Sequence, residues 1–224
     1  MKVIAIHQPN YLPWLGYFHK IASSDVFVFL DNVDYQYGNA TSVTNRAKIK
    51  THSGVQLLSV PVKKNKESKL ISQMGIDYNQ TWQRKHLAAI KLSYAKTPYF
   101  ATLFPVLEQL IEANYETLSQ LNIALIQGLC RFLNIQTPLV IASELGQLPT
   151  DRNMRLIEIC KQLNGTCYLS GQGGKKYNNQ QWFSENGLEI TYTDFVHPTY
   201  AQQFGEFIPN LSAIDSIFNT GKAF

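Results

Sequence analysis

The sequence predicts an α/β fold: a mostly parallel, doubly wound sheet with an inserted β-hairpin and a helical lobe. Short apolar runs of strand length recur along the chain and alternate with segments of helical periodicity. Polar or glycine-rich segments follow these runs, as they do at the carboxyl ends of parallel strands. We therefore expect one α/β domain over residues 1–224, with the hairpin inserted at 32–63 and the helical lobe at 80–134.

Composition narrows the class of protein. Of the 224 residues, 45% are hydrophobic and 16% are charged, which allows a sizeable core and argues against general disorder. The net charge of +4 fits an anionic small molecule better than nucleic acid, which usually needs clustered Lys and Arg. We expect a small-molecule substrate with a phosphate or nucleotide moiety, and no nucleic-acid partner.

The chain also carries signals of its compartment. It has no apolar stretch of about 18 residues, so we expect no membrane span. Met1-Lys2 leads straight into a strand-like run, which does not resemble a signal peptide. Cys130, Cys160 and Cys167 lie within apolar patterns and are expected to be buried free thiols. These features predict a cytoplasmic protein.

The first thirty residues read as a β–α–β unit. A strand over 2–7 contains the apolar run Val3–Ile6, and a helix over 13–22 follows, with Pro13 in its first turn. A second strand covers 26–30, and the crossover between the strands should be right-handed. Gly16 lowers the helix propensity of the first turn, and close approach of a ligand or another backbone would explain it.

The pattern then changes before the parallel unit resumes. Segments 43–50 and 55–62 alternate around a turn at 51–54, which predicts an antiparallel hairpin, either a flap or an edge element added to the sheet. Helical periodicity begins near Trp82 and continues through three helices. The later elements, in chain order, are a strand at 139–142, a helix at 151–163, a strand at 167–169, a helix at 180–185, a strand at 188–193 and a last helix from 208.

The strand ends supply the first candidate site residues. His7 follows the first strand and could act as a general acid or base, or donate to a phosphate; alternatively, it caps the strand end. The loop Ser170–Lys176 follows the fourth strand, and its glycines and lysines could bind an anion, unless it is only a flexible connection. Within this loop Ser170, Gly171 and Lys175 are the expected anion contacts.

Further candidates lie in three other segments. Asn45-Arg46 in the hairpin could clamp a carboxylate or phosphate, although such an Arg is often a solvated charge. Lys85-His86 could face an anion at a helix start, or belong to an ordinary amphipathic helix. His197 and Tyr200, after the last strand, could orient a substrate.

The opening motif and the strand-end carboxylates complete the set. Trp14 beside two prolines could stack on a ligand or belong to the core. The remaining expected ligand contacts of this stretch are Gln8, Asn10, Tyr11, Gly16 and His19. No Cys/His spacing indicates a metal site; Asp31, Glu144 and Asp194 could bind Mg²⁺ together with a nucleotide, but no spacing marks them.

Nearly the whole chain resembles the WbqC-like family of bacterial proteins. The residues that carry the likeness are His7-Gln8-Pro9-Asn10-Tyr11-Leu12-Pro13-Trp14-Leu15-Gly16-Tyr17-Phe18, Asn45-Arg46, Val60-Pro61-Val62, Trp82, Lys85-His86, Tyr168-Leu169-Ser170-Gly171, His197-Pro198, Tyr200, Leu211-Ser212, Ile214-Asp215 and Phe218-Asn219. The resemblance implies a role in surface-polysaccharide and O-antigen biosynthesis, with a transferase acting on a sugar or its amino group as the usual assignment.

A more distant resemblance is to the nucleotidylyltransferase α/β fold. Pro13-Trp14-Leu15-Gly16-Tyr17 stands where those enzymes carry a His-x-Gly-His motif, and Ser170–Lys176 could match their late loop. Trp14 and Tyr17 replace the two histidines, which puts the usual stabilisation of a transferring phosphate in doubt, although His7 and His19 could substitute. Two functions remain open. One is an enzyme of nucleotidyl, acyl or aminoacyl transfer; the other is a non-catalytic nucleotide- or sugar-binding or assembly protein.

Overall fold

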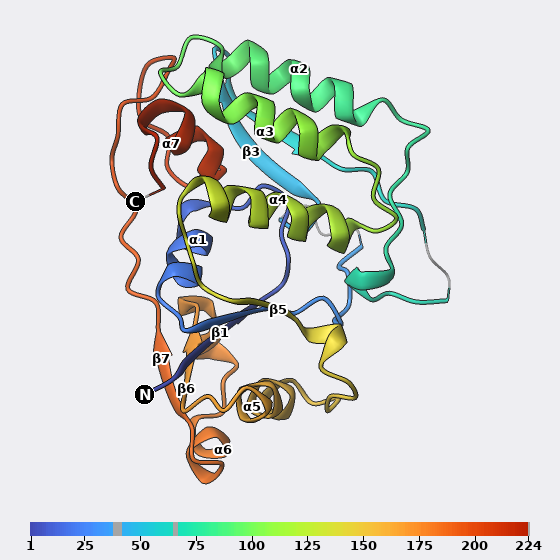
Figure 1. The fold of residues 1–224 in the computed structure, drawn as a ribbon, viewed down its shortest axis with the longest axis vertical. Helices are drawn as coiled ribbons and strands as arrows, with labels where there is room; N and C mark the ends of the chain where they lie inside the picture. The colour runs from blue at the N-terminus through green and yellow to red at the C-terminus, as the bar shows by residue number, and fades with distance from the viewer. Residues whose placement is uncertain (38–41, 65–66, 224) are drawn as a thin grey trace.

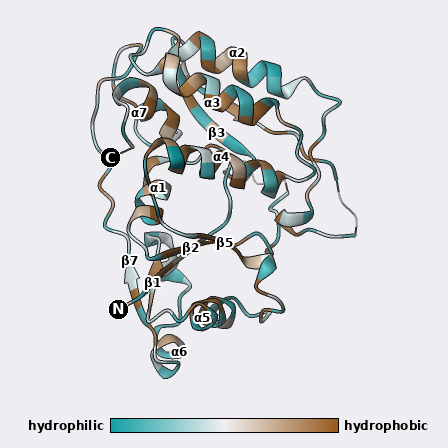
Figure 2. Cartoon of the chain, in the orientation of Figure 1, coloured by the Kyte–Doolittle hydropathy of each residue, from teal (hydrophilic) through white to brown (hydrophobic). Residues whose placement is uncertain are grey.

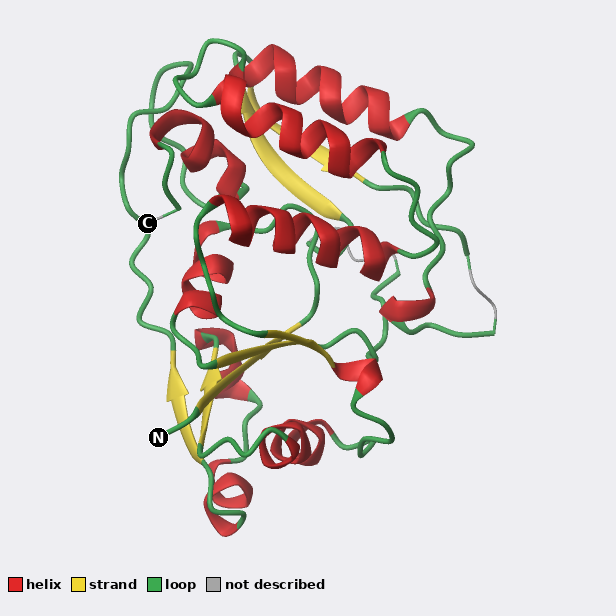
Figure 3. Cartoon of the chain, in the orientation of Figure 1, coloured by secondary structure: helices red, strands yellow, loops and turns green. Residues whose placement is uncertain are grey.

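A five-stranded parallel sheet forms the centre of the protein, whose computed structural model describes residues 1–37, 42–64 and 67–223. The strands lie in the order β5-β2-β1-β6-β7, with every neighbouring pair parallel (Figures 1 and 3). Their bounds are β1 (Val3–His7), β2 (Val26–Phe29), β5 (Leu139–Ile141), β6 (Cys167–Ser170) and β7 (Glu189–Tyr192). The chain order reverses between β1 and β6, which makes this edge the topological switch point of a doubly wound sheet.

Helices cover both faces of this sheet, as the sequence predicts. Along β1, Ile4 and Ile6 pack with α5 (Arg152–Gln162) and α6 (Gln180–Glu185), whereas Ala5 faces α1 (Leu15–Ala22). Every residue of β2 and β6 is buried, so both faces of these inner strands are covered, whereas the edge strand β7 alternates exposed and half-buried residues. The ribbons of β1 and β2 are accordingly mostly hydrophobic in Figure 2. In Figure 1, α5 and α6 lie below the sheet and α1 lies above it.

The hairpin is not an edge element of the parallel sheet, so that alternative of the prediction was wrong. Its strands β3 (Arg46–Thr51) and β4 (Gly54–Ser59) form a separate antiparallel sheet. Ala47, Ile49 and Leu58 are buried in the same core cluster as the apolar residues of the helical segment. The alternating pattern therefore reflects a face that packs on helices, not one that extends the parallel sheet.

Four helices complete this upper part of the molecule. They are α2 (Trp82–Tyr94), α3 (Phe100–Glu112), α4 (Leu118–Phe132) and the C-terminal α7 (Ala213–Thr220). Short 3₁₀ turns lie at Ile71–Gln73, Ala142–Glu144 and Gln172–Lys176. α7 begins five residues later than residue 208, because Asn210 adopts a left-handed backbone with φ 59° that a helix cannot contain. None of the helices in the described ranges has the length and apolar character needed to cross a bilayer.

A buried asparagine joins the two parts where the opening motif leaves the sheet. The side-chain nitrogen of Asn122 in α4 donates to the carbonyl oxygens of Pro9 and Thr44, at 2.9 and 2.7 Å. The Tyr11 amide also donates to the Thr44 carbonyl, at 3.2 Å. The loop after β1 is thereby fixed against both α4 and the start of the hairpin.

Candidate functional site

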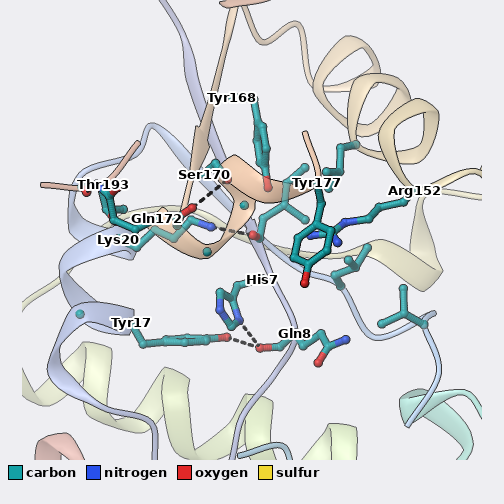
Figure 4. A pocket seen from close by; sticks show the side chains of 18 of the residues that line it. His7, Gln8, Tyr17, Lys20, Arg152, Tyr168, Ser170, Gln172, Tyr177 and Thr193 are labelled. Carbon is teal, nitrogen blue, oxygen red and sulfur yellow. Dashed lines mark hydrogen bonds between the residues drawn. The ribbon is translucent and has the colours of Figure 1, made fainter. Parts of the chain in front are cut away.

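A pocket of about 740 Å³ opens at the switch point of the sheet (Figure 4). Its walls come from the end of β1, from α1, from the loop after β6 and from the first turns of α5. His7 and the Ser170–Gly174 loop lie in the same pocket, although more than 160 residues separate them in sequence. Parallel strands make this possible because their carboxyl ends meet at one edge.

His7 is held in a defined orientation in this pocket. Its Nδ1 lies 3.1 Å from the Gln8 carbonyl oxygen, which fixes the proton on Nδ1 and leaves Nε2 as an acceptor. The Tyr17 ring stands edge-on to the imidazole at 4.9 Å, and its hydroxyl donates to the same Gln8 carbonyl at 2.9 Å. Burial, and then the charge of Lys20, lower the pKa of His7 to about 4, so the ring is neutral at pH 7.

Lys20 is the cation at the floor of the pocket, and the sequence-based candidates did not include it. Its side chain is 3% exposed, and its Nζ donates to the Ile6 carbonyl at 2.8 Å and lies 5.9 Å from the centre of the Tyr168 ring. Burial lowers the pKa of Lys20 to about 7, and burial is the sole cause of the shift. The contacts of its Nζ are the Ile6 carbonyl and the Tyr168 ring, so no carboxylate of the described residues pairs with this lysine.

The loop after β6 supplies a compact glycine turn. The Ser170 hydroxyl donates to the Gly171 carbonyl at 3.1 Å and accepts from the side-chain Nδ2 of Asn178 at 2.9 Å. Gly174 approaches this hydroxyl so closely that an added Cβ would lie 2.1 Å from it. Lys175, expected as an anion contact, instead lies over the Tyr192 ring at 5.1 Å and is not among the residues that line the pocket.

Arginines from α5 provide positive charge where Lys175 does not. The guanidinium of Arg152 stacks over the Tyr177 ring at 4.7 Å, and both side chains line the pocket (Figure 4). Arg155 lines it as well, but its Nε and Nη2 donate to the carbonyls of Pro149 and Thr150. Asp34 is the single acidic residue among the lining residues, so the pocket favours an anionic ligand.

A second pocket, of about 560 Å³, adjoins the first. His7 and Trp14 line both pockets, and the second is completed by the opening motif, the hairpin and the segment before α7. Asn10, Tyr11 and Arg46 line this second pocket. The structure therefore places some of the expected ligand residues in one or the other of two adjacent pockets, and the rest in neither.

Gly16 is explained by side chains, not by a ligand or a neighbouring backbone. A Cβ added at Gly16 would lie 2.9 Å from the Trp14 ring and 3.0 Å from the Phe195 ring. The two rings meet edge-to-face at 6.1 Å. The glycine lets Trp14 fold back over α1, where it forms part of the wall between the pockets.

A family model described as the WbqC-like protein family matches residues 8–223. The chain belongs to this family. The uncharacterized protein Rv1507c of Mycobacterium tuberculosis (strain ATCC 25618 / H37Rv) is 33% identical, over 99% of this chain and 95% of its own length. No solved structure matches.

Two further candidates of this WbqC-like protein lie away from both pockets. His86 is buried in α2, where its Nδ1 lies 2.9 Å from the Tyr11 hydroxyl, and burial lowers its pKa to about 4. Lys85 is exposed beside it on α2. The position of His86 indicates that it supports Tyr11 from behind the second pocket.

The histidine after β7 is occupied by the backbone. His197 Nδ1 donates to the Pro198 carbonyl at 2.8 Å, and its Nε2 accepts from the Asn210 amide at 3.2 Å. The Tyr200 hydroxyl donates to Asp215 at 2.9 Å. Neither residue lines the two pockets, and both tie the segment before α7 in place.

The remaining candidates have mostly structural contacts. The Asn45 amide donates to the Val60 carbonyl at 2.9 Å, and the His19 ring packs against Phe195 at 5.3 Å. Asp31 accepts from the Ser143 amide and hydroxyl at 3.0 and 2.8 Å, which uses both of its oxygens. In the described part of the chain, no three His, Cys, Asp or Glu side chains gather as metal ligands would.

Proposed function

We propose that this WbqC-like protein is a transferase of bacterial surface-polysaccharide biosynthesis that binds a phosphate-bearing or nucleotide-activated substrate in the switch-point pocket. The observation that carries the proposal is Lys20, a buried amine with which no carboxylate of the described residues pairs. Burial destabilises such a charged amine when the pocket is empty, and a bound anion would offset this destabilisation. The family supports the polysaccharide pathway, and the transfer reaction is our inference.

Each pocket residue has a role in this proposal. Lys20 and Arg152 would hold the phosphate, with amide groups of the Gly171–Gly174 loop beside it. His7 is neutral at pH 7, and its Nε2 can accept a proton from the attacking group. The three cysteines are free and buried, which supports a reducing, cytoplasmic setting.

The test is a binding screen followed by a matched pair of variants. The panel contains nucleotides, nucleotide sugars, acyl-CoA and aminoacyl adenylates, each with and without Mg²⁺, read by thermal shift and then by calorimetry. Lys20→Met should weaken binding of a hit by roughly 10- to 100-fold, the effect of losing a charged hydrogen bond. Lys96→Met, at an exposed position, should leave the affinity unchanged.

Two results would contradict the proposal. One is a panel in which no phosphate-bearing compound raises the melting temperature. The other is a Lys20→Met protein that binds the hit as tightly as the parent. Incubation of the hit with candidate sugar acceptors, followed by mass spectrometry, then separates the transferase from a non-catalytic binding protein, because only the former yields a covalently altered product.

A further inference from the structure

We propose that the second pocket is a separate ligand subsite for a small molecule that combines an oxyanion with an apolar portion. Binding in the second pocket does not depend on the proposed function. Only the idea that the two pockets belong to one site rests on it. The pockets share His7 and Trp14, so ligands in the two would face each other across these side chains. Trp14 is 41% exposed, although the residues next to it are buried.

Two unpartnered polar groups indicate that this pocket receives a ligand. The Asn10 side chain is 2% exposed, and its Nδ2 has no acceptor among the described residues. The Ser212 hydroxyl, in a residue 4% exposed, likewise has no partner there. Both residues line the pocket, and burying such groups without a hydrogen-bond partner destabilises a protein. A ligand that accepts hydrogen bonds from them would offset that destabilisation.

The charge of the pocket specifies the kind of ligand. Arg46 and Lys48 line it, and no Asp or Glu does so among the described residues. The positive charge of these two side chains, with the unpartnered Nδ2 of Asn10, suits a carboxylate or a phosphate. Leu57 and Val43 form part of an apolar wall, which suits a hydrocarbon portion next to the anion.

The backbone of the opening motif is also unusual here. Leu12 has φ 40°, in the left-handed region that a leucine rarely adopts, and it is 1% exposed in the wall of the pocket. Strained conformations of this kind persist where the surroundings impose them, and they concentrate at ligand sites. The strain therefore agrees with the unpartnered polar groups in locating a ligand at this place.

The test uses three fluorinated probes on the full-length protein, followed by ¹⁹F NMR line broadening. The probes are 4-fluorobenzoate, 4-fluorophenyl phosphate and the neutral 4-fluorobenzamide. We expect one of the two anions to bind and the benzamide to bind at least 10-fold more weakly. Whichever anion binds identifies the source of the oxyanion, carboxylate or phosphate.

Variants assign the binding to a pocket. Arg46→Gln should lower the affinity for the anionic probe about 10-fold or more, as expected for the loss of a charge-assisted contact. Val43→Trp fills the pocket from a position that is 49% exposed, so it should block the probe without disturbing the core. Lys20→Met, in the first pocket, should leave the affinity for a benzoate probe within about 2-fold.

The outcomes also separate this inference from the proposed function. No binding of either anion at 10 mM, or affinities unchanged by both Arg46→Gln and Val43→Trp, would overturn the second subsite. If Lys20→Met alone abolishes binding of a probe, that probe binds in the first pocket, and this result would also overturn the inference. A third outcome would contradict the proposed function but not this subsite. In it, no phosphate-bearing compound binds in the first pocket, whereas 4-fluorobenzoate binds and Val43→Trp weakens that binding.

Discussion

The Nζ atom of Lys20 lies 2.8 Å from the carbonyl oxygen of Ile6, so a side chain of α1 donates into the backbone of the central strand. The lysine stem spans the buried face of the helix, and its charged end meets the end of the sheet below the pocket. A structural lysine would normally be solvated or paired with an acid. The buried, unpaired ammonium group of Lys20 therefore lowers the stability of the fold and places a positive charge at the switch point.

Replacing this cation should stabilise the protein. We expect Lys20→Met to raise the free energy of unfolding by about 1–4 kcal/mol near pH 6, because it removes an uncompensated buried charge, less the lost bond to Ile6. Urea unfolding measures the change, with Lys96→Met as the surface control. A Lys20→Met protein less stable than the parent would show that the lysine is a net structural contact.

The same lysine should make stability depend on alkaline pH. Its pKa is about 7 in the native state and 10.5 ordinarily, so between these values the unfolded chain binds more protons than the native one. Stability should therefore rise as the pH is raised from 7 towards about 9. From about pH 9 upwards the buried thiols of Cys130 and Cys160, whose pKa burial raises to about 12, act in the opposite direction, and so do the buried hydroxyls of Tyr11 and Tyr17 at higher pH.

Chemical denaturation at pH 7, 8 and 9 measures this slope. The Lys20→Met variant should lose most of the rise, since it has no amine to deprotonate. A variant with the same slope as the parent would assign the pH dependence to other groups and contradict the lowered pKa of Lys20.

His7 should stay neutral well into the acid range. Its pKa of about 4 lies below the ordinary 6.5, so the unfolded chain takes up a proton in this window before the native one does. Stability is thus lost as the pH falls from 6.5 towards 4, by up to about 3 kcal/mol from this residue. Imidazole ¹⁵N NMR, assigned with His7→Gln, should show the Nδ1–H tautomer at pH 5.5; a doubly protonated ring at that pH would contradict this environment.

The sequence predicts the inner strands of the sheet well because β1, β2 and β6 are short apolar runs whose residues are mostly buried. It also predicts that His7 and Ser170 come together in one pocket, since they end parallel strands whose carboxyl ends meet at one edge. The hairpin could not be placed in the same way, because an alternating pattern shows that one face is buried but not what buries it.

Individual site residues were harder to predict, for a different reason. Lys20 reads as a surface residue, and its only signal is its place among Tyr17, Phe18 and Ile21 on the buried face of α1. Conversely, the sequence suggests that His197 is reactive, yet both of its ring nitrogens are hydrogen-bonded to the backbone. Their partners are the Pro198 carbonyl and the Asn210 N–H, and the second is distant in sequence. Which polar groups face a pocket depends on hydrogen bonds that periodicity does not encode.

Gly16 should tolerate no side chain. We expect Gly16→Ala to destabilise the protein by about 1–3 kcal/mol, because its Cβ would overlap the Trp14 and Phe195 rings, and overpacking has costs of this size. Gly171→Ala is the matched control, since an added Cβ there meets no atom within 4 Å. Thermal unfolding of the two variants gives the comparison, and equal melting temperatures would show that Trp14 moves aside at little cost.

The pair formed by Tyr11 and His86 should behave as one structural unit. The tyrosine hydroxyl lies 2.9 Å from His86 Nδ1 in a buried setting, so removing either partner leaves the other unsatisfied. We expect Tyr11→Phe and His86→Leu each to cost about 1–3 kcal/mol, and the double variant to cost less than their sum. Urea unfolding of all four proteins gives the coupling energy, and additive costs would show that the two side chains do not depend on each other. A structural histidine also predicts that His86→Gln, which keeps a hydrogen-bonding side chain, retains both binding of the switch-point ligand and product formation. A catalytic histidine predicts loss of product with binding intact.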